Sequence, residues 1–189
     1  IKNPKVISDG DKILRYVQMI RDENKRMHSQ VENVLRISRL EKNQIEISKE
    51  NIDMHDIIDD AISHTSLLIS DRNGSIDTYF EALTAEVAGN QFHLTNVIVN
   101  IIENALKYSQ DTVNITITKK KLSVSDIGIG INSKDISKLT EKFYRVSNNG
   151  WNNSMGVGLS LVSNILNIHN FSLDIKSTEN EGSTFSIVF

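Results

Sequence analysis

Cysteine is absent from this chain of 189 residues, and proline and tryptophan occur only once each. The absence of cysteine excludes disulfides and thiol chemistry, and it is compatible with a reducing cytoplasm. No apolar run is long enough to span a bilayer, and no signal peptide opens the chain. The net charge of −3 does not favour nucleic acid or an anionic membrane as a partner. A globular protein is expected, and the first residue, isoleucine, indicates a fragment of a longer chain.

The most informative segment is residues 92–108, where the spacing of apolar residues predicts one helix. The opposite face carries a polar row that includes three asparagines, a residue that competes with its own backbone in a helix: Asn96, Asn100, Glu103, Asn104 and Lys107. Amide oxygens are suitable ligands for Mg²⁺, and a lysine in the same row would meet phosphate charge. The alternative is a polar surface stripe without a ligand.

Residues 9–43 are predicted to form one long, highly charged helix with an apolar seam. The seam repeats every seven residues and includes the polar residue Asn24. Its positions are Ile13, Val17, Ile20, Asn24, Met27, Val31, Val34 and Ser38. Because a lone helix of this kind is marginal, the seam predicts partner helices from a second subunit or from parts of a longer chain outside this sequence. Packing on the chain's own core is the alternative.

The remainder, residues 44–189, is predicted to be a compact α+β domain, with residues 1–43 as a separate helical element. Strands are expected at 44–48, 76–80, 85–87, 113–118, 122–126, 171–176 and 184–189. A hairpin turn at 119–121 is expected to join 113–118 to 122–126, and 171–176 and 184–189 are expected to form an antiparallel pair. Asp53 is expected to cap a helix that ends near residue 70, and Ser133 or Asp135 to cap a short one. A further helix is expected from Gly156 to His169.

Three glycine-containing segments suggest ligand contacts. Asp126 follows a predicted strand and begins a DxGxG segment, so its carboxylate would stand at the edge of a sheet, where it could accept the amine of adenine. Gly156 and Gly158 open a predicted helix, whose first amides form a natural phosphate site. Residues 182–185, with the sequence GSTF, form a turn into the last strand. Each signal is weak alone, and their order and spacing make them specific.

In this order the motifs resemble those of the histidine kinases of two-component signalling, whose catalytic domain belongs to the GHKL ATPase superfamily. Residues 100–109 resemble the N box, 126–130 the G1 box, 143–145 the F box and 156–159 the G2 box. The resemblance implies a two-layer α/β sandwich of the GHKL or Bergerat type. The long N-terminal helix resembles the second helix of the dimerisation and histidine-phosphotransfer domain, so nearly the whole chain is covered.

The resemblance implies ATP and Mg²⁺ as ligands and gives roles to the matching residues. Asn100 and Asn104 would hold Mg²⁺, Lys107 and Arg145 would meet the phosphates, and Asp126 would bind the adenine amino group. The implied catalytic residues are Glu103, Asn104, Lys107 and Arg145, with Glu103 in a supporting part. The other implied nucleotide contacts are Tyr108, Gly128, Gly130, Ile131, Gly156, Val157, Gly158, Leu159 and Thr184.

Four departures from the family pattern affect the nucleotide lid and the sheet edge. Thr140 replaces the first aromatic of the F box, Ile127 replaces an asparagine in the G1 box, and Ser154 replaces the first glycine of the G2 region. The loop over 147–155 is short for an ATP lid. Nucleotide binding is still expected despite these departures. They put lid closure and the rate of phosphotransfer in question.

The implied activity is transfer of the γ-phosphoryl group of ATP to a histidine, for relay to the receiver domain of a response regulator. The resemblance also implies a homodimer through the N-terminal helix and a cytoplasmic location, with the parent protein anchored in a bacterial inner membrane. Two alternatives remain: a catalytically weak regulatory module that binds nucleotide, and a GHKL ATPase of the chaperone, gyrase or mismatch-repair kind. The N-terminal seam and the FYR segment argue against the latter.

The phosphoacceptor segment of the family, which has a His-Glu-x-x-Thr-Pro-like pattern, does not occur in the sequence. The five histidines lie in other contexts: His28, His55, His64, His93 and His169. We therefore expect ATP binding without autophosphorylation. Incubation with labelled ATP should leave the chain unlabelled after denaturation, and acid-labile label on any of the five histidines would contradict the prediction.

Overall fold

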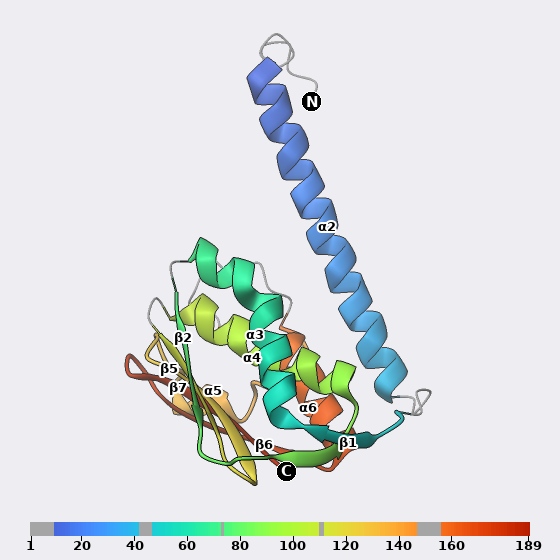
Figure 1. Ribbon diagram of the computed structural model, residues 1–189. Coiled ribbons are helices and arrows are strands. Elements are labelled where there is room, and N and C mark those ends of the chain that lie inside the picture. The colour runs from blue at the N-terminus through green and yellow to red at the C-terminus, as the bar shows by residue number, and fades with distance from the viewer. Residues whose placement is uncertain (1–9, 42–46, 73, 110–111, 147–155) are drawn as a thin grey trace.

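The structure, a computed structural model, describes residues 10–41, 47–72, 74–109, 112–146 and 156–189. A five-stranded sheet carries a layer of helices on one face, and a long helix stands beside that layer (Figure 1). The expected two-layer α/β arrangement is confirmed. In chain order the elements are α2 (Gly10–Glu41), β1 (Glu50–Asp53), α3 (Met54–Asp71), β2 (Ile76–Phe80), β3 (Glu86–Gly89), α4 (Gln91–Tyr108), β4 (Val113–Ile117), β5 (Lys121–Asp126), α5 (Ser133–Ile136), α6 (Gly158–His169), β6 (Ser172–Thr178) and β7 (Gly182–Val188).

The five-stranded sheet has the order β2-β4-β5-β7-β6, and β1 pairs with β3 in a separate two-stranded sheet. The predicted pairs β4–β5 and β6–β7 are antiparallel, whereas β2 joins β4 in parallel. In the pairing of β5 with β7, Val124 lies opposite Phe185 and Leu122 opposite Ile187, and all four side chains are buried. Because side chains alternate along a strand, their neighbours point to the opposite face of the sheet.

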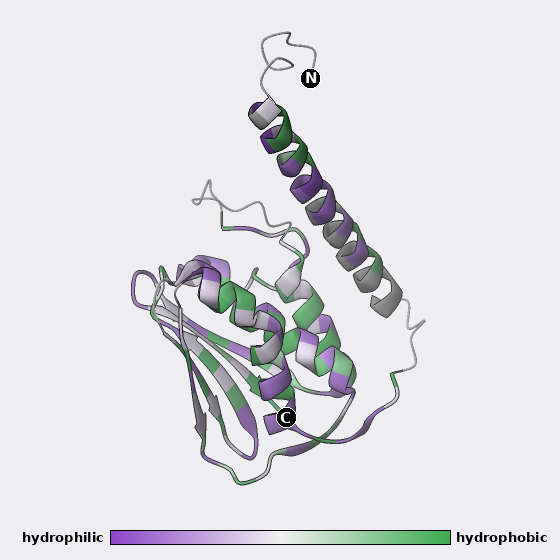
Figure 2. Ribbon diagram, turned by 45° about the horizontal axis from the view of Figure 1, so that its top comes forward, coloured by the Kyte–Doolittle hydropathy of each residue, from purple (hydrophilic) through white to green (hydrophobic). Residues whose placement is uncertain are grey.

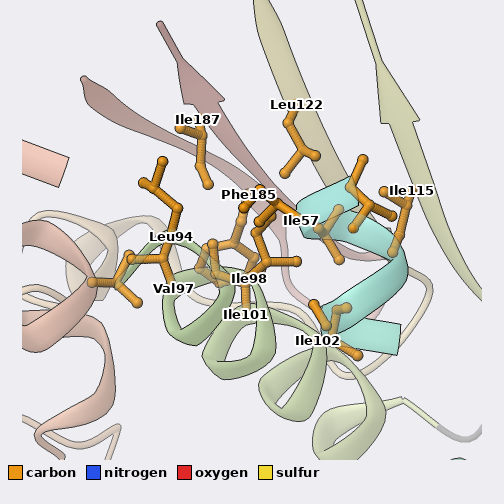
Figure 3. Close-up of a cluster of buried hydrophobic side chains, with 14 of the residues drawn as sticks. Ile57, Leu94, Val97, Ile98, Ile101, Ile102, Ile115, Leu122, Phe185 and Ile187 are labelled. Atoms are coloured by element: carbon orange, nitrogen blue, oxygen red, sulfur yellow. The ribbon is translucent and has the colours of Figure 1, made fainter. Parts of the chain in front are cut away.

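The hydrophobic core lies between the sheet and α4, which packs against α3 and α6 (Figure 3). Ile98, Ile101 and Ile102 of α4 are fully buried there. Burial of one such side chain contributes about 1.5–3 kcal/mol to stability. The apolar face of α4 is therefore fixed against the sheet, which leaves its polar row on the outer side.

The two longer helices of the domain, α3 and α4, begin at side chains of the types that favour the N-cap position. Asp53 is the N-cap of α3 and its carboxylate accepts a hydrogen bond from the backbone N–H of His55 at 3.0 Å. Asn90 caps α4 in the same way, since its side-chain oxygen accepts from the N–H of His93. These contacts satisfy donors that a helix N-terminus otherwise leaves unpaired.

Three local expectations were wrong. The first strand begins at Glu50, because its pairing with β3 selects 50–53; residues 47 and 48 are not in a strand, and 42–46 lie outside the described residues. The cap of α5 is Asn132, whose side chain accepts from the N–H of Lys134. Gly156 has φ +69°, which is not helical, so α6 begins at Gly158.

The long helix expected near the N-terminus is confirmed as α2, and it contacts α6 (Figure 1). Figure 2 shows hydrophobic and hydrophilic residues sharing its described turns. Much of the seam remains open: Val17 is 42% exposed, Ile20 54%, Met27 57% and Val31 52%. The side chains of Val34 and Ser38 lie outside the described residues. Among the described residues, no helix is long and apolar enough to cross a bilayer.

The C-terminus of α6 is joined to the start of α4 by a buried histidine. The ring Nδ1 of His169 lies 2.7 Å from the carbonyl oxygen of Ile165, and its Nε2 accepts from the N–H of Asn90 at 3.1 Å. Since a carbonyl only accepts and an amide N–H only donates, these partners require the neutral ring. Burial lowers the pKa of His169, an effect that the Ile165 carbonyl opposes and the charge of Lys49 reinforces.

We expect this histidine to make the fold less stable in mild acid. With its folded pKa lowered, its contribution is fully present above the ordinary histidine pKa of about 6.5, and it is lost as the pH falls towards the folded value. Urea unfolding of the parent chain at pH 7.5 and 5.5 should show this drop, and His169→Gln should show a smaller one. His28→Gln, on the exposed surface of α2, is the control. An equal drop in the parent and His169→Gln would contradict the prediction.

Candidate functional site

The polar row on α4 presents amide oxygens outwards. The side-chain nitrogen of Asn96 donates to the carbonyl of Phe92 at 2.6 Å, and that of Asn100 donates to the carbonyl of Asn96 at 2.8 Å. Each amide nitrogen thus has one of its two N–H groups bonded within the helix, and the side-chain oxygen can serve as an acceptor or ligand for other partners. Asn104 lies one turn after Asn100 and is partly exposed.

The start of α6 lies against this row. A Cβ atom built on Gly158 would lie 3.1 Å from Oδ1 of Asn100, which is tighter than most such contacts. Only a residue without a side chain leaves this oxygen unobstructed. Val157 is buried and Leu159 packs against the core, so the apolar residues beside Gly158 anchor the helix start. The predicted G2 segment and N box are therefore adjacent.

The F-box segment is held against the same turn by its backbone. The N–H of Phe143 donates to the carbonyl of Gly156 at 2.9 Å. A Cβ on Gly156 would come within 2.4 Å of the Tyr144 carbonyl oxygen and 3.1 Å of Cγ of Arg145. With a φ of +69°, position 156 favours glycine on both grounds. Arg145 is consequently brought to the side of the turn that precedes α6.

Positive charge gathers at the C-terminal end of α4. Burial lowers the pKa of Lys107, and the charges of Arg145 and Arg72 lower it further, while Glu103 opposes them. Arg72 also donates to the carbonyl of Leu106 at 2.9 Å and to that of Lys107 at 3.2 Å, so it completes the end of the helix. A polyanion bound here would stabilise the protonated form of Lys107.

Glu103 is the acid of this group. Burial of its carboxyl raises the pKa of Glu103, and the charge of Lys107 acts in the opposite direction. The residue as a whole remains exposed, so its carboxyl lies at the margin of the cluster. Lys107 is also 5.4 Å from the ring centroid of Tyr108, which places the predicted tyrosine beside the cations.

Asp126 is a buried carboxylate at the end of β5, with 7% of its surface exposed. It accepts a hydrogen bond from the N–H of Gly128 at 2.8 Å. Burial raises the pKa of Asp126, and the backbone N–H groups of Gly128 and Ser183 oppose that shift. An acid held in this way can accept a further donor that enters from the helical side of the sheet.

The loop after Asp126 is fastened to the end of α4. The N–H of Ile129 donates to the carbonyl of Tyr108 at 3.2 Å, and a Cβ on Gly128 would lie only 2.2 Å from that oxygen. On its other side the loop meets β6, where the N–H of Ile131 donates to Oγ of Ser177 at 2.8 Å. The predicted G1 and N boxes are therefore in direct contact.

Thr184 does not join this group. It shares a face of the sheet with Ser125, and their hydroxyl oxygens are 3.0 Å apart. Asp126 is paired with Ser183, and each lies two residues from a buried core residue of its strand, Val124 or Phe185, so both face the helices. The hydroxyl of Ser183, which is 3.0 Å from that of Ser177, is the one beside Asp126. The alternation of the apolar residues in GSTFSIVF is the signal that could have identified Ser183.

The family described as Histidine kinase-, DNA gyrase B-, and HSP90-like ATPase matches residues 89–189, which is more than half of the chain. Sensor protein RprX of Bacteroides fragilis is 29% identical over 197 residues, covering 99% of this chain and 38% of that protein. Phosphate regulon sensor protein PhoR of Pseudomonas aeruginosa is 29% identical over 184 residues, covering 93% and 41%. The chain thus spans less than half the length of these curated relatives.

Two solved structures share the fold. Full-length ShkA in complex with AMPPNP aligns with a TM-score of 0.81 at 20% identity, over 92% of this chain and 37% of that chain. The Acinetobacter baumannii histidine kinase AdeS aligns with a TM-score of 0.73 at 17% identity, over 90% and 81%. Both alignments extend over nearly the whole of this chain.

The backbone approach at the G1 loop predicts a strict requirement for glycine. Gly130 has φ +62°, and a Cβ there would lie 1.9 Å from the backbone oxygen of Thr178. Gly130→Ala should therefore lower the free energy of unfolding by more than about 1 kcal/mol in urea titrations. Gly10→Ala is the control, because a Cβ at Gly10 meets nothing within 4 Å. Similar unfolding midpoints for the two variants would refute the strain.

Proposed function

The chain belongs to the histidine kinase-, DNA gyrase B- and HSP90-like ATPase family, and on that premise we propose that it is the ATP-binding catalytic portion of a sensor histidine kinase. The observation that carries the proposal is the meeting of three segments around α4. The oxygen of Asn100 lies against Gly158, Lys107 lies among cations that include Arg145, and the backbone of Tyr108 holds the loop of Asp126.

The adenine would bind at the sheet edge. Asp126 would accept the exocyclic amine, and Ser183, which shares its face, is a second polar contact. Gly128, Gly130 and Ile131 would line this end through a backbone loop that the core and β6 hold in place. A carboxylate here serves the purine and stays clear of the triphosphate, whose charge it would repel.

The triphosphate would extend towards the start of α6. Backbone amides at Gly156 and Gly158 would face the phosphates at the positive end of a 12-residue helix. Lys107 and Arg145 would neutralise the negative charge from the side of α4. Neutralisation would in turn relieve the mutual repulsion that depresses the pKa of Lys107.

The donor set fits a magnesium ion that retains waters. Asn100 and Asn104 offer neutral amide oxygens on one face of α4, and the turn at Gly158 leaves the first of these clear. The described residues contain no group of three histidine, cysteine, aspartate or glutamate side chains that could hold a metal. A metal here would therefore depend on amides and phosphate oxygens, and it would supply charge neutralisation at the phosphates.

Phosphoryl transfer requires position and charge compensation more than covalent help. Lys107, Arg145 and the glycine amides would provide both, and Glu103, with its raised carboxyl pKa, is placed to receive a proton. The acceptor would be a histidine outside this set. His169 is buried in two hydrogen bonds as the neutral ring, and His55 is bonded to Asp53 at 2.6 Å, so neither is presented as a nucleophile.

The wider assignments rest on the relatives, which are named as sensor proteins. The proposal includes a response-regulator receiver domain as the phosphoryl acceptor downstream and a cytoplasmic location beneath a membrane-anchored sensor. The exposed seam of α2 supports a homodimer through that helix, with residues 1–43 as the remnant of the dimerisation domain and residues 44–189 as the catalytic domain. A monomer in sedimentation at high concentration would count against the dimer.

A regulatory module with weak catalysis is the second candidate. Ile127 stands in the G1 loop with 62% of its surface exposed, an apolar side chain where the family has an asparagine. This favours altered contacts at the nucleotide. Histidine phosphate formed on a separately supplied phosphoacceptor domain would select the kinase, whereas binding of ATP with no transfer would select the regulatory module.

Calorimetric titration with ATP tests the site. Asp126→Asn should weaken binding about tenfold with or without Mg²⁺, because it removes the acceptor charge for the adenine amine. Asn104→Ala should reduce only the part of the affinity that depends on Mg²⁺. Equal affinity of the parent and both variants would refute the assignment.

Two neighbouring hydroxyls provide a matched control for the same titration. Ser183→Ala removes the hydroxyl on the face of Asp126 and should weaken ATP binding. Thr184→Val removes the one on the opposite face, beside Ser125, and should leave ATP affinity unchanged. Weaker binding by Thr184→Val alone would restore the role that the sequence motif assigns to Thr184.

A further inference from the structure

A hollow lies at the N-terminal end of α4, and Gly156, Val157 and Gly158 do not line it. It has a volume of about 450 Å³ and is formed by β1, α3 and the first turns of α4. Acidic residues Glu50 and Asp60 stand on its walls, and none of the described residues that line it is a lysine or arginine. His64 is the other titratable lining residue. The nucleotide proposal does not use this hollow.

Each side-chain amide around the hollow uses one of its two N–H groups within the protein. The side-chain nitrogen of Gln91 donates to Asp60 at 2.9 Å, that of Asn96 to the carbonyl of Phe92 at 2.6 Å, and that of Asn90 to the carbonyl of Ser48 at 3.2 Å. The oxygen ends of Gln91 and Asn96 therefore remain for a ligand, together with the carboxylates. The walls are rich in acceptors and negative charge.

A residue with a buried hydroxyl, Thr95, also lines the hollow. Thr95 is only 5% exposed, and its Oγ1 has no hydrogen-bond partner among the described residues. A buried polar atom without a hydrogen-bond partner destabilises the folded protein, and most buried polar atoms in folded proteins have a partner. The lining therefore includes a residue whose hydroxyl lacks a partner.

The charge balance favours a cation in spite of the helix N-terminus. The first turn of α4 carries about half a positive charge, and the side-chain oxygen of Asn90 already accepts from one of its N–H groups. Two carboxylates outweigh that partial charge. The described residues offer no group of three ligating side chains for a compact metal ion. A flat cation with several donors fits better, because a guanidinium carries five N–H groups in a planar fork.

We propose that this hollow binds the guanidinium group of an arginine side chain on another polypeptide. Glu50 and Asp60 would pair with the charge, the oxygens of Gln91 and Asn96 would accept its outer N–H groups, and the ring of Phe92, 61% exposed, would stack on its plane. Most of the walls are exposed, so a small metabolite would stay largely in water here. An arginine side chain on a second polypeptide would be shielded from water by the surface of that polypeptide.

The test is a titration of the chain, without nucleotide, with a capped Gly-Arg-Gly peptide, followed by the backbone amide signals of α4 in NMR. Shifts should concentrate at residues 91–96. The citrulline peptide, which keeps the shape and removes the charge, should bind at least about tenfold more weakly. Equal affinity for the arginine and citrulline peptides would overturn the proposal, as would shifts confined to the C-terminal half of α4.

Charge-removing variants locate the contact on the hollow. Glu50→Gln and Asp60→Asn should each weaken the arginine peptide several-fold, whereas Asp59→Asn, an exposed neighbour on α3 that does not line the hollow, should not. Equal losses of affinity in all three variants would show that only net charge matters, and they would overturn the proposed site. Agmatine, a free guanidinium compound, should bind no more tightly than the peptide, and tenfold tighter binding would overturn the assignment to a polypeptide.

Discussion

The carbonyl group at the end of α4 and the backbone of the loop after β5 meet with no side chain between them. At Gly128 a Cβ would lie 2.2 Å from the Tyr108 oxygen, and Ile129 donates a hydrogen bond to that same oxygen. This contact joins the polar row of α4 to the acid at the edge of the sheet. The two halves of the candidate site are therefore parts of one rigid unit, and their separation is set by backbone geometry and not by flexible side chains.

Charge is distributed along α4 in opposite senses at its two ends. Cations collect near its C-terminus, where Lys107 is influenced by Arg72 and Arg145. Acids collect near its N-terminus, where Glu50 and Asp60 line a hollow. The two local groups of charge stand out because the net charge of the whole chain is only −3. One helix thus separates a surface suited to anions from a surface suited to cations.

Local patterns were enough to predict much of the fold. The apolar stripe of α4, the cap at Asp53 and the two antiparallel pairs follow from residues close together in the sequence. The parallel pairing of β2 with β4 was not predicted, because it depends on a connection that crosses the helical layer. The first strand was placed too early for the same reason: its partner, β3, lies more than thirty residues away.

The candidate site was predictable to the extent that its motifs are local. Asn100 lies close to Gly158 and Tyr108 close to Gly128, as expected if the motifs form one site. The spacing of the motifs in the sequence could not predict either contact. Thr184 was assigned by its place in a short motif, and the strand register turns it to the other face. Arg72, which closes the end of α4, has no motif, and it is recognised only once the helix ends are seen together.

The alternation of β7 has an evolutionary consequence. Ser183 and Thr184 are adjacent hydroxyl residues, yet one faces Asp126 and the other faces Ser125 on the outer side of the sheet. In the proposed site, selection for the ligand would act on the first and would leave the second to the weaker demands of a sheet surface. Position 184 would then drift between small β-forming residues while position 183 would be held, even though a single peptide bond separates them.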